Sequence, residues 1–176
     1  MRDNRIIVDW FSATFRLKVE ELLDMFGIVP EIFVRTTGHQ GYSWCYRYEG
    51  INIHFERDDG TIWLEMSGKG CRTWENLFVF EWPRFIETVL NLPDLLNITR
   101  IDVAADIFND LLPIKTLAQH TRDLSWVSKW NEWEVIEGSK GITINFGSRT
   151  SDIFLRIYDK GAEQKTEHSW VRVELQ

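Results

Sequence analysis

Apolar and polar residues alternate along five short stretches of the chain, residues 51–56, 62–67, 100–107, 153–160 and 171–176. In each stretch apolar residues recur at every second position, with Asp159 as the exception, and most of the residues between them are polar or charged. Successive side chains of a strand point to opposite faces, so this period of two predicts five strands with one apolar and one polar face.

Helices are expected in three places. Residues 17–26 carry apolar positions at helical spacing, and Gly27 follows as a residue that commonly ends helices. Residues 82–92 have Pro83 in the first turn, where proline is favoured. A shorter helix is expected over residues 113–120.

Further strands are expected in residues 5–10, 42–48 and 141–148, with tight turns at 49–50 and 59–60. Strands dominate the order of elements, and helices interrupt them only in places. This order favours an α+β fold, a mainly antiparallel sheet with helices on one face and an open polar face.

The chain has 176 residues, an apolar fraction of 44% and nine Trp residues, which suits a single folded domain over residues 1–176. Residues 170–176 form a strand-like end without a cap or turn, so we expect further chain beyond them. No apolar run is long enough to span a membrane, and no signal peptide is evident. Cys45 and Cys71 lack a metal-ligand spacing and are expected as free thiols in a reducing cytoplasm.

The formal net charge is −7, which argues against a surface that is basic throughout, as in many nucleic-acid-binding proteins. Attraction to phosphates depends on Lys and Arg near the contact. Any nucleic-acid contact of this chain therefore needs a local basic groove, and its non-specific affinity is expected to be modest.

The polar faces of the three C-terminal strands combine acids, cations and a phenol. The residues are Asp102, Asp106, Glu174, Lys160, Arg172 and Tyr158. If these strands are neighbours, the set supplies what metal-assisted phosphoryl transfer requires, and the polar face becomes a catalytic face. The alternative is a half-buried sheet that turns ordinary polar residues and cross-strand ion pairs toward water.

Strand spacing restricts how the acids share a metal ion. Asp102 and Asp106 lie about 13 Å apart in a regular strand. One Mg²⁺ or Mn²⁺ ion cannot span that distance, because carboxylate oxygens bind at about 2.0–2.6 Å. We expect Asp102 to hold the ion with Glu174, and Asp106 is kept as a further candidate. An ion pair of Asp102 with Arg172 or Arg100 is the alternative.

Tyr158 would need activation as a nucleophile, because a free tyrosine has a pKa near 10. Lys160 is two residues away, and its charge could favour the phenolate or stabilise a phosphate. Arg156 and Arg172 could hold phosphate oxygens. An amphipathic aromatic side chain at a sheet surface is the alternative for Tyr158.

Residues 67–72, Ser-Gly-Lys-Gly-Cys-Arg, are expected to form a glycine-rich loop that can approach a ligand closely. Lys69 and Arg72 would then bind the DNA backbone, with Arg149 as a further contact. A loop with solvated cations is the alternative. His54 stands alone on its strand and is expected to be a satisfied, non-catalytic histidine.

Six blocks of this sequence, in order, resemble the Rep_trans replication initiation factors, which include plasmid rolling-circle initiators and related relaxases of integrative conjugative elements. The blocks are VDWFSATF, YRYEGINIHF, LEMSGKGCRTWE, TRIDVAADIF, INFGSRTSDIFLRIYDKGAEQ and WVRVELQ. They span nearly the whole chain, and their shared order and spacing make the resemblance specific.

The resemblance implies a metal-dependent DNA nicking and joining enzyme. In that family the tyrosine of the R-x-Y-D-K block, here Tyr158, attacks the scissile phosphodiester and becomes linked to the 5′ phosphate. The acidic candidates come from the R-x-D-x-A-x-D block (Asp102 and Asp106) and the R-x-E block (Glu174). The implied partner is single-stranded or cruciform origin DNA, and a host helicase and a second copy of the chain are further candidates.

Two other functions fit parts of the pattern. An open sheet with Trp63, Phe154 and Tyr158 could stack on unpaired bases without cleaving the strand, as a non-catalytic single-stranded nucleic-acid-binding module. The negative charge also suits a protein-interaction domain. Metal-independent binding without cleavage would favour the first, and failure to bind DNA at low salt would favour the second.

Overall fold

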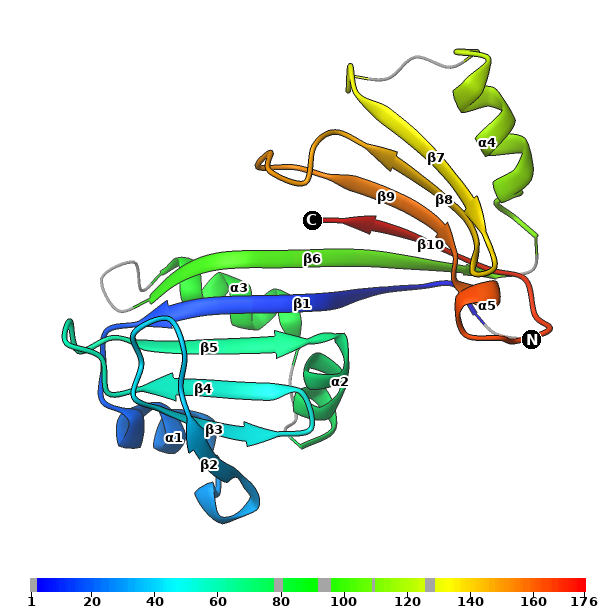
Figure 1. Cartoon of the computed structure of the whole chain (residues 1–176). Coiled ribbons are helices and arrows are strands. Elements are labelled where there is room, and N and C mark those ends of the chain that lie inside the picture. Colours follow the sequence, from blue (N-terminus) through cyan, green and yellow to red (C-terminus); the bar gives the residue numbers. More distant parts are fainter. Residues whose placement is uncertain (1–2, 78–80, 92–95, 109, 126–128) are drawn as a thin grey trace. The chain divides into compact units, whose positions relative to one another are not determined.

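A computed structural model describes residues 3–77, 81–91, 96–108, 110–125 and 129–176. Contacts divide the chain into two compact units, unit 1 and unit 2. Unit 1 comprises residues 1–7 and 102–176, and unit 2 comprises residues 8–101. Each unit has an antiparallel sheet with helices packed on one face (Figure 1).

The ten strands of the described residues pair in the order β2-β3-β4-β5-β1-β6-β10-β9-β8-β7. Two long strands, β1 (Arg5–Phe15) and β6 (Leu96–Phe108), contribute residues to both units. Unit 2 adds β2 (Val34–Thr37), β3 (Trp44–Tyr48), β4 (Ile51–Phe55) and β5 (Ile62–Ser67). Unit 1 adds β7 (Trp133–Gly138), β8 (Gly141–Phe146), β9 (Leu155–Asp159) and β10 (Trp170–Leu175). The α+β class and the open antiparallel sheet predicted from the sequence are confirmed.

The helices of each unit pack against the apolar face of its sheet. Unit 2 has α1 (Val19–Phe26), the 3₁₀ turn η1 (Pro30–Ile32), α2 (Gly68–Leu77) and α3 (Trp82–Leu90). Its core joins the apolar face of β4 and β5 to Leu22, Cys71 and Trp74 from the helices. Unit 1 has α4 (Ile114–Arg122) and the short α5 (Lys160–Glu163), and its core joins Ile114 and Ala118 of α4 to the apolar side chains of β8–β10.

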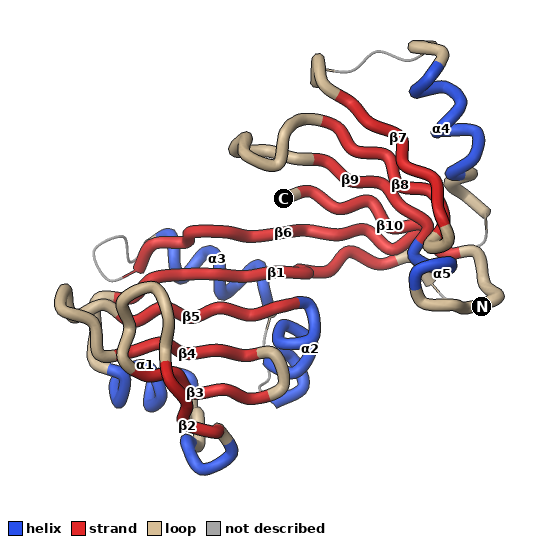
Figure 2. The backbone as a smooth tube through the Cα atoms, viewed as in Figure 1, coloured by secondary structure: helices blue, strands red, loops and turns tan. Residues whose placement is uncertain are grey.

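The alternation of apolar and polar residues correctly predicted strands that have one buried face. Ile51, Ile53, Leu64 and Met66 are fully buried, as their alternation predicts. Two strands, β2 and β7, were not predicted (Figure 2). β2 has four residues, and every residue of β7 except Val135 is exposed, so neither shows a clear period of two in burial. Both predicted tight turns are present. Cys45 and Cys71 are buried, and neither forms a disulfide bond.

The prediction of a glycine-rich loop at residues 67–72 is wrong, because residues 68–77 form α2. Cys71 and Trp74 are buried at helical spacing and tie this helix to the core. Gly70 allows the helix to approach the turn between β3 and β4, since a Cβ atom there would lie 2.1 Å from the carbonyl oxygen of Gly50. The glycine therefore serves backbone packing within unit 2.

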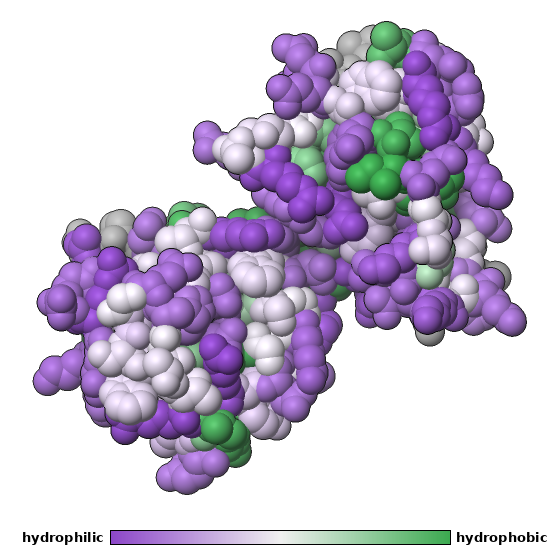
Figure 3. Space-filling model, in the orientation of Figure 1, coloured by the Kyte–Doolittle hydropathy of each residue, from purple (hydrophilic) through white to green (hydrophobic). Residues whose placement is uncertain are grey.

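Polar side chains cover most of the visible surface of each unit, and apolar surface is confined to small patches (Figure 3). None of the described helices combines the length and the apolar character that crossing a bilayer demands.

Candidate active site and metal-binding residues

The polar face of unit 1 is assembled by β6, β10 and β9, which are neighbours in the sheet, a condition that the sequence had left open. Arg172 of β10 lies opposite Asp106 of β6 and Tyr158 of β9. Glu174, two residues along, lies opposite Ala104 and Arg156. Acids, cations and the phenol therefore share one face of the sheet.

This polar face is buried even though it carries charged side chains. Asp106 is 0% exposed, Tyr158 is 4% exposed and Arg172 is 5% exposed. Val103, on the opposite face of β6, is 37% exposed. Burial of ions is costly unless they are paired and hydrogen-bonded, so the partners of these groups decide what each can do.

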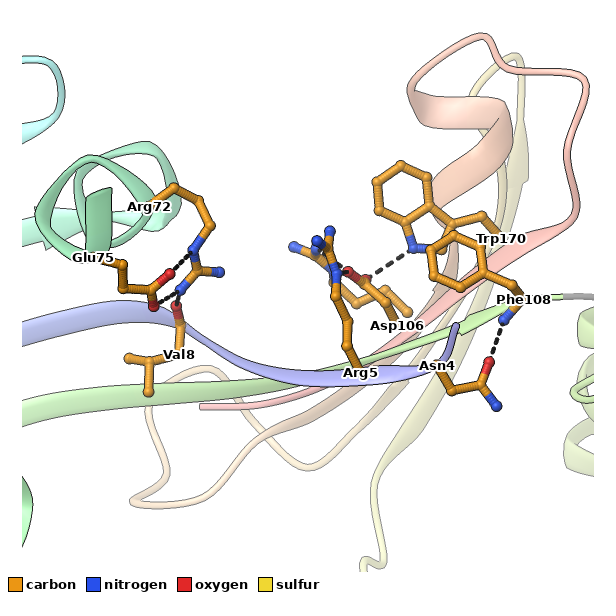
Figure 4. Close-up of polar contacts among 9 residues, drawn as sticks. Asn4, Arg5, Val8, Arg72, Glu75, Asp106, Phe108 and Trp170 are labelled. Atoms are coloured by element: carbon orange, nitrogen blue, oxygen red, sulfur yellow. Dashed lines mark hydrogen bonds and ion pairs between the residues drawn. The ribbon is translucent and has the colours of Figure 1, made fainter. Parts of the chain in front are cut away.

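Asp106 is the centre of an ion-pair network (Figure 4). Its Oδ1 accepts hydrogen bonds from Arg172 Nε at 2.7 Å and from Trp170 Nε1 at 2.8 Å. Its Oδ2 accepts hydrogen bonds from Arg5 Nε at 2.9 Å and from Arg172 Nη2 at 3.0 Å. Both oxygens thus have cationic partners, an environment unlike that of a metal ligand.

Burial alone would raise the pKa of Asp106. The hydrogen bonds from Arg172, Trp170 and Arg5 and the charge of Arg172 outweigh that effect, and the pKa of Asp106 falls below its ordinary value. The carboxylate is therefore ionised at neutral pH, and it holds the Arg172 guanidinium in the strand position next to Tyr158.

Tyr158 lies between two cations. The guanidinium carbon of Arg156 is 4.2 Å from the centroid of its ring, and the Nζ atom of Lys160 is 5.4 Å from it. Burial, followed by the negative charge of Glu174, raises the pKa of Tyr158 well above its ordinary value, although Arg172 and Arg156 oppose the shift. The phenol therefore keeps its proton at neutral pH in the isolated chain.

The cations around Tyr158 differ in their partners. Lys160 was predicted on a strand but is the first residue of α5, because β9 ends at Asp159, and it forms an ion pair with Glu163. The Nε of Arg156 is buried and has no hydrogen-bond partner within the described part of the chain. Arg149 is exposed, with its guanidinium carbon 5.9 Å from the Phe154 ring centroid. Arg156 is thus the cation of this face with an unmet donor.

The two predicted aspartates stand on either side of Glu174. Because Glu174 lies opposite Ala104, Asp102 and Asp106 are its two diagonal neighbours on β6. Asp102 is 2% exposed and Glu174 is 6% exposed, and Gln176 Nε2 donates to Glu174 Oε1 at 2.5 Å. Carboxylates at diagonal positions on neighbouring strands are close enough to share one ion. Asp102 and Asp106, four residues apart on the same strand, are too far apart to do so.

The two cations predicted to bind DNA from residues 67–72 have acidic partners in unit 2. Lys69 forms an ion pair with Glu49. Arg72 donates from Nε to Glu75 at 2.7 Å and from a terminal nitrogen to the carbonyl oxygen of Val8 at 2.8 Å (Figure 4). Both cations therefore form ion pairs within unit 2, and Arg72 also joins α2 to β1.

Sequence reasoning missed one group of possible metal ligands. His39, His54 and Glu65 each offer a ligand atom, and these atoms lie within 4.8 Å of one another. Burial, then the charges of His39 and Arg47, lowers the pKa of His54 to about 4, so its ring is neutral at pH 7. Strand pairing could have placed His54 and Glu65 on one face, but His39 comes from a turn that the period of two cannot position.

Two family models match this chain, and together they cover most of it. Residues 5–88 match the N-terminal domain of rolling-circle replication initiation proteins, and residues 96–176 match the Rep_trans replication initiation factors. The second match contains Tyr158 and the three acids.

Two relatives agree with these matches. The rolling-circle replication initiator of Geobacillus stearothermophilus is 28% identical, with a TM-score of 0.86 over 98% of this chain and 74% of that one. The putative DNA relaxase NicK of Bacillus subtilis (strain 168) is 24% identical over 96% of this chain. The chain spans about half (54%) of the length of that curated relative. The two family models and the shared fold together establish that the chain belongs to the Rep_trans family of rolling-circle replication initiators.

Proposed function

We propose that this chain nicks one strand of origin DNA, and later rejoins it, with Tyr158 as the nucleophile. The proposal assigns residues 1–176 to a single nicking and joining unit that works in the cytoplasm. Both relatives are named for this kind of DNA processing, one as a replication initiator and one as a putative relaxase.

The observation that carries the proposal is the pairing of Tyr158 with an incompletely bonded arginine. Buried donors in folded proteins almost always have partners, and exceptions mark ligand or catalytic sites often enough to need an explanation. The Nε of Arg156 is such an exception, and its guanidinium lies over the Tyr158 ring. A phosphodiester oxygen is the type of acceptor that this guanidinium lacks.

In the proposed reaction the Tyr158 hydroxyl oxygen attacks the scissile phosphorus. A bond forms between this oxygen and phosphorus, and the bond from phosphorus to the 3′ oxygen breaks. The phenolic proton passes to solvent, and the departing 3′ oxygen takes up a proton from solvent. The products are a 5′-phosphotyrosine and a free 3′ hydroxyl that can prime synthesis. Attack by a second 3′ hydroxyl on the phosphotyrosine reverses these bonds and rejoins a strand.

Asp102 and Glu174 are the proposed ligands of a Mg²⁺ or Mn²⁺ ion. Two carboxylates at diagonal positions fit a hard divalent cation, whereas Asp106 is already bonded to Arg172, Arg5 and Trp170. When bound, such an ion would supply positive charge where the negative charge of Glu174 raises the pKa of Tyr158.

Lys160 and Arg172 are proposed to stabilise the charge that develops on the phosphate. Arg172 is held in place by Asp106, and Lys160 is 15% exposed in its side chain and lies near the Tyr158 ring. Arg149, Lys69 and Arg72 are proposed as contacts to the DNA backbone outside this centre. A host helicase and a second copy of the chain remain proposed partners.

The test is a denaturing gel with labelled single-stranded origin DNA and Mn²⁺. Wild-type chain is expected to yield a shortened strand and a protein-linked fragment, and Tyr158→Phe is expected to yield neither. Tyr48→Phe, a substitution of a tyrosine packed against Phe33 in unit 2, is the matched control and should behave as wild type. A covalent adduct formed by Tyr158→Phe would show that another residue is the nucleophile.

Binding without cleavage is the second candidate, because the burial of Tyr158 counts against nicking; Phe154 and Tyr158 are both 4% exposed, so such binding would not use them for base stacking. A phenol that is 4% exposed cannot reach a phosphodiester unless neighbouring side chains move. Binding of the same oligonucleotide that is unaffected by chelation, together with the absence of any shortened strand, would support this candidate.

A further inference from the structure

Three side chains outside the proposed nicking centre meet on the polar face of the unit 2 sheet. His54 on β4 lies opposite Trp63, and Glu65 on β5 lies opposite Asn52, so both point to the same face. His39 reaches them from the turn between β2 and β3. Ligand atoms bound at about 2.0–2.2 Å to one ion lie up to about 4.4 Å apart. The separation of these three atoms, at most 4.8 Å, is close to that geometry.

His54 has an unmet hydrogen-bonding atom at the centre of this group. The residue is 0% exposed, and its Nδ1 has no hydrogen-bond partner in the part of the chain that the structure describes. Its other ring nitrogen, Nε2, lies 3.8 Å from the Sγ atom of Cys45. Histidine ligands characteristically use one ring nitrogen for the metal and the other for a neighbouring partner. His54 is arranged in this way, with Nδ1 left for an ion.

The other two ligands are held by their surroundings. Asn52 Nδ2 donates to Oε1 of Glu65 at 3.3 Å, which orients that carboxylate. His39 sits in a turn closed by a hydrogen bond from Gly38 N to Ser43 O at 3.0 Å. Its ring packs edge-on against His54, with centroids 4.3 Å apart. The turn and the sheet therefore hold the imidazoles together before any ion binds.

We propose that His39, His54 and Glu65 bind one divalent transition-metal ion of the zinc class, in preference to Mg²⁺. Two imidazoles and one carboxylate suit Zn²⁺ and its neighbours, whereas Mg²⁺ prefers oxygen ligands alone. Three protein ligands leave a coordination position open, and His39 is exposed, so solvent or an anion can reach it. This site shares no residue with the proposed nicking centre and does not depend on it.

The test is calorimetric titration of untagged, chelator-stripped chain with Zn²⁺, Mn²⁺ or Mg²⁺, with elemental analysis of the dialysed product. We expect one equivalent of Zn²⁺ and much weaker binding of Mg²⁺. His39→Gln and Glu65→Gln should each weaken Zn²⁺ binding by more than about tenfold, the scale already caused by losing only an outer partner of a ligand. His120→Gln is the matched control, because His120 is exposed and bonds only to Ser125 among the described contacts.

Thermal unfolding gives an independent readout. Zn²⁺ should raise the unfolding midpoint of wild type and of His120→Gln, and should not raise that of His39→Gln, because a ligand stabilises only the state that binds it. Asp102→Asn and Tyr158→Phe should bind Zn²⁺ as wild type does, even if both fail to nick. Absence of Zn²⁺ binding by wild type, equal binding by His39→Gln, or its loss in Asp102→Asn would each overturn the proposal.

Discussion

Replacing Asp106 by Asn removes the charge at the centre of the unit 1 ion-pair network and keeps the shape of the side chain. The carboxylate is 0% exposed and accepts from Arg172, Arg5 and Trp170. Asn has a single acceptor oxygen and an amide that would face a guanidinium. At least one buried donor of Arg172 therefore loses its partner.

The magnitude follows from that loss. Removing one partner of a buried ion pair costs about 3–5 kcal/mol, because the remaining charge is left uncompensated. Asn can still accept one hydrogen bond, so we expect about 3 kcal/mol for Asp106→Asn. For a chain of this size, about 2–4 °C per kcal/mol converts this into a midpoint lowered by about 6–12 °C.

The pH dependence has a definite sign. The folded-state pKa of Asp106 lies below its ordinary value of 3.8, so its stabilising contribution is fully present above pH 3.8. The contribution is lost as the pH falls from 3.8 through the lower folded-state value. Asp106→Asn lacks the stabilising contribution of the carboxylate at every pH. Its free energy of unfolding should therefore be closest to that of wild type at the lowest pH, where wild type has lost this contribution too.

The assay is urea unfolding of wild type, Asp106→Asn and the exposed control Asp123→Asn at pH 7 and at several acid values. Asp123 accepts from Gln119 on the surface of α4, so its substitution should cost less than about 1 kcal/mol. A loss below about 1 kcal/mol for Asp106→Asn would refute the structural role of Asp106. The structural role would also be refuted if Asp106→Asn kept the stability of wild type but needed a much higher Mn²⁺ concentration for nicking, since a metal ligand behaves in that way.

Three further substitutions separate catalysis from packing. Asp102→Asn should raise the Mn²⁺ concentration for half-maximal nicking by about tenfold or more, and an unchanged concentration on titration would remove Asp102 from the metal site. Arg156→Met should slow nicking and leave urea stability unchanged or higher, because a buried donor without a partner is lost; a loss above about 2 kcal/mol would contradict this. Gly70→Ala should lower the free energy of unfolding in urea by about 1–3 kcal/mol, because its Cβ would meet the Gly50 carbonyl. Gly138→Ala, with open space around it, is the control and should be near neutral.

Prediction from the sequence succeeded where one local rule dominates. The apolar face of β4, the turn at Glu49–Gly50 and the helix that ends at Gly27 all depend on neighbouring residues, and all three are present. It failed for residues 67–72, because two glycines and two cations look like a loop locally. The helix there is favoured by the burial of Cys71 and Trp74 and by contact with a turn from another part of the chain.

The candidate site shows the same division. Alternation along β6, β9 and β10 put Asp102, Asp106, Tyr158, Arg172 and Glu174 on polar strand faces, and the pairing of these strands makes those faces one surface. Their order in the sheet could not be read from period two, which describes each strand separately and says nothing of its neighbours.

By itself, the sequence determined the alternation of the strands, the α+β class and the family, because these depend on local periodicity and on the order of motifs. Only the tertiary structure decided what each charged group does. It joined Asp106 to Arg172, Arg5 and Trp170, and it brought His39 to His54 and Glu65. The physical reason is that the state of a buried charge is set by the partners within about 3–4 Å of it, and those partners come from distant parts of the chain.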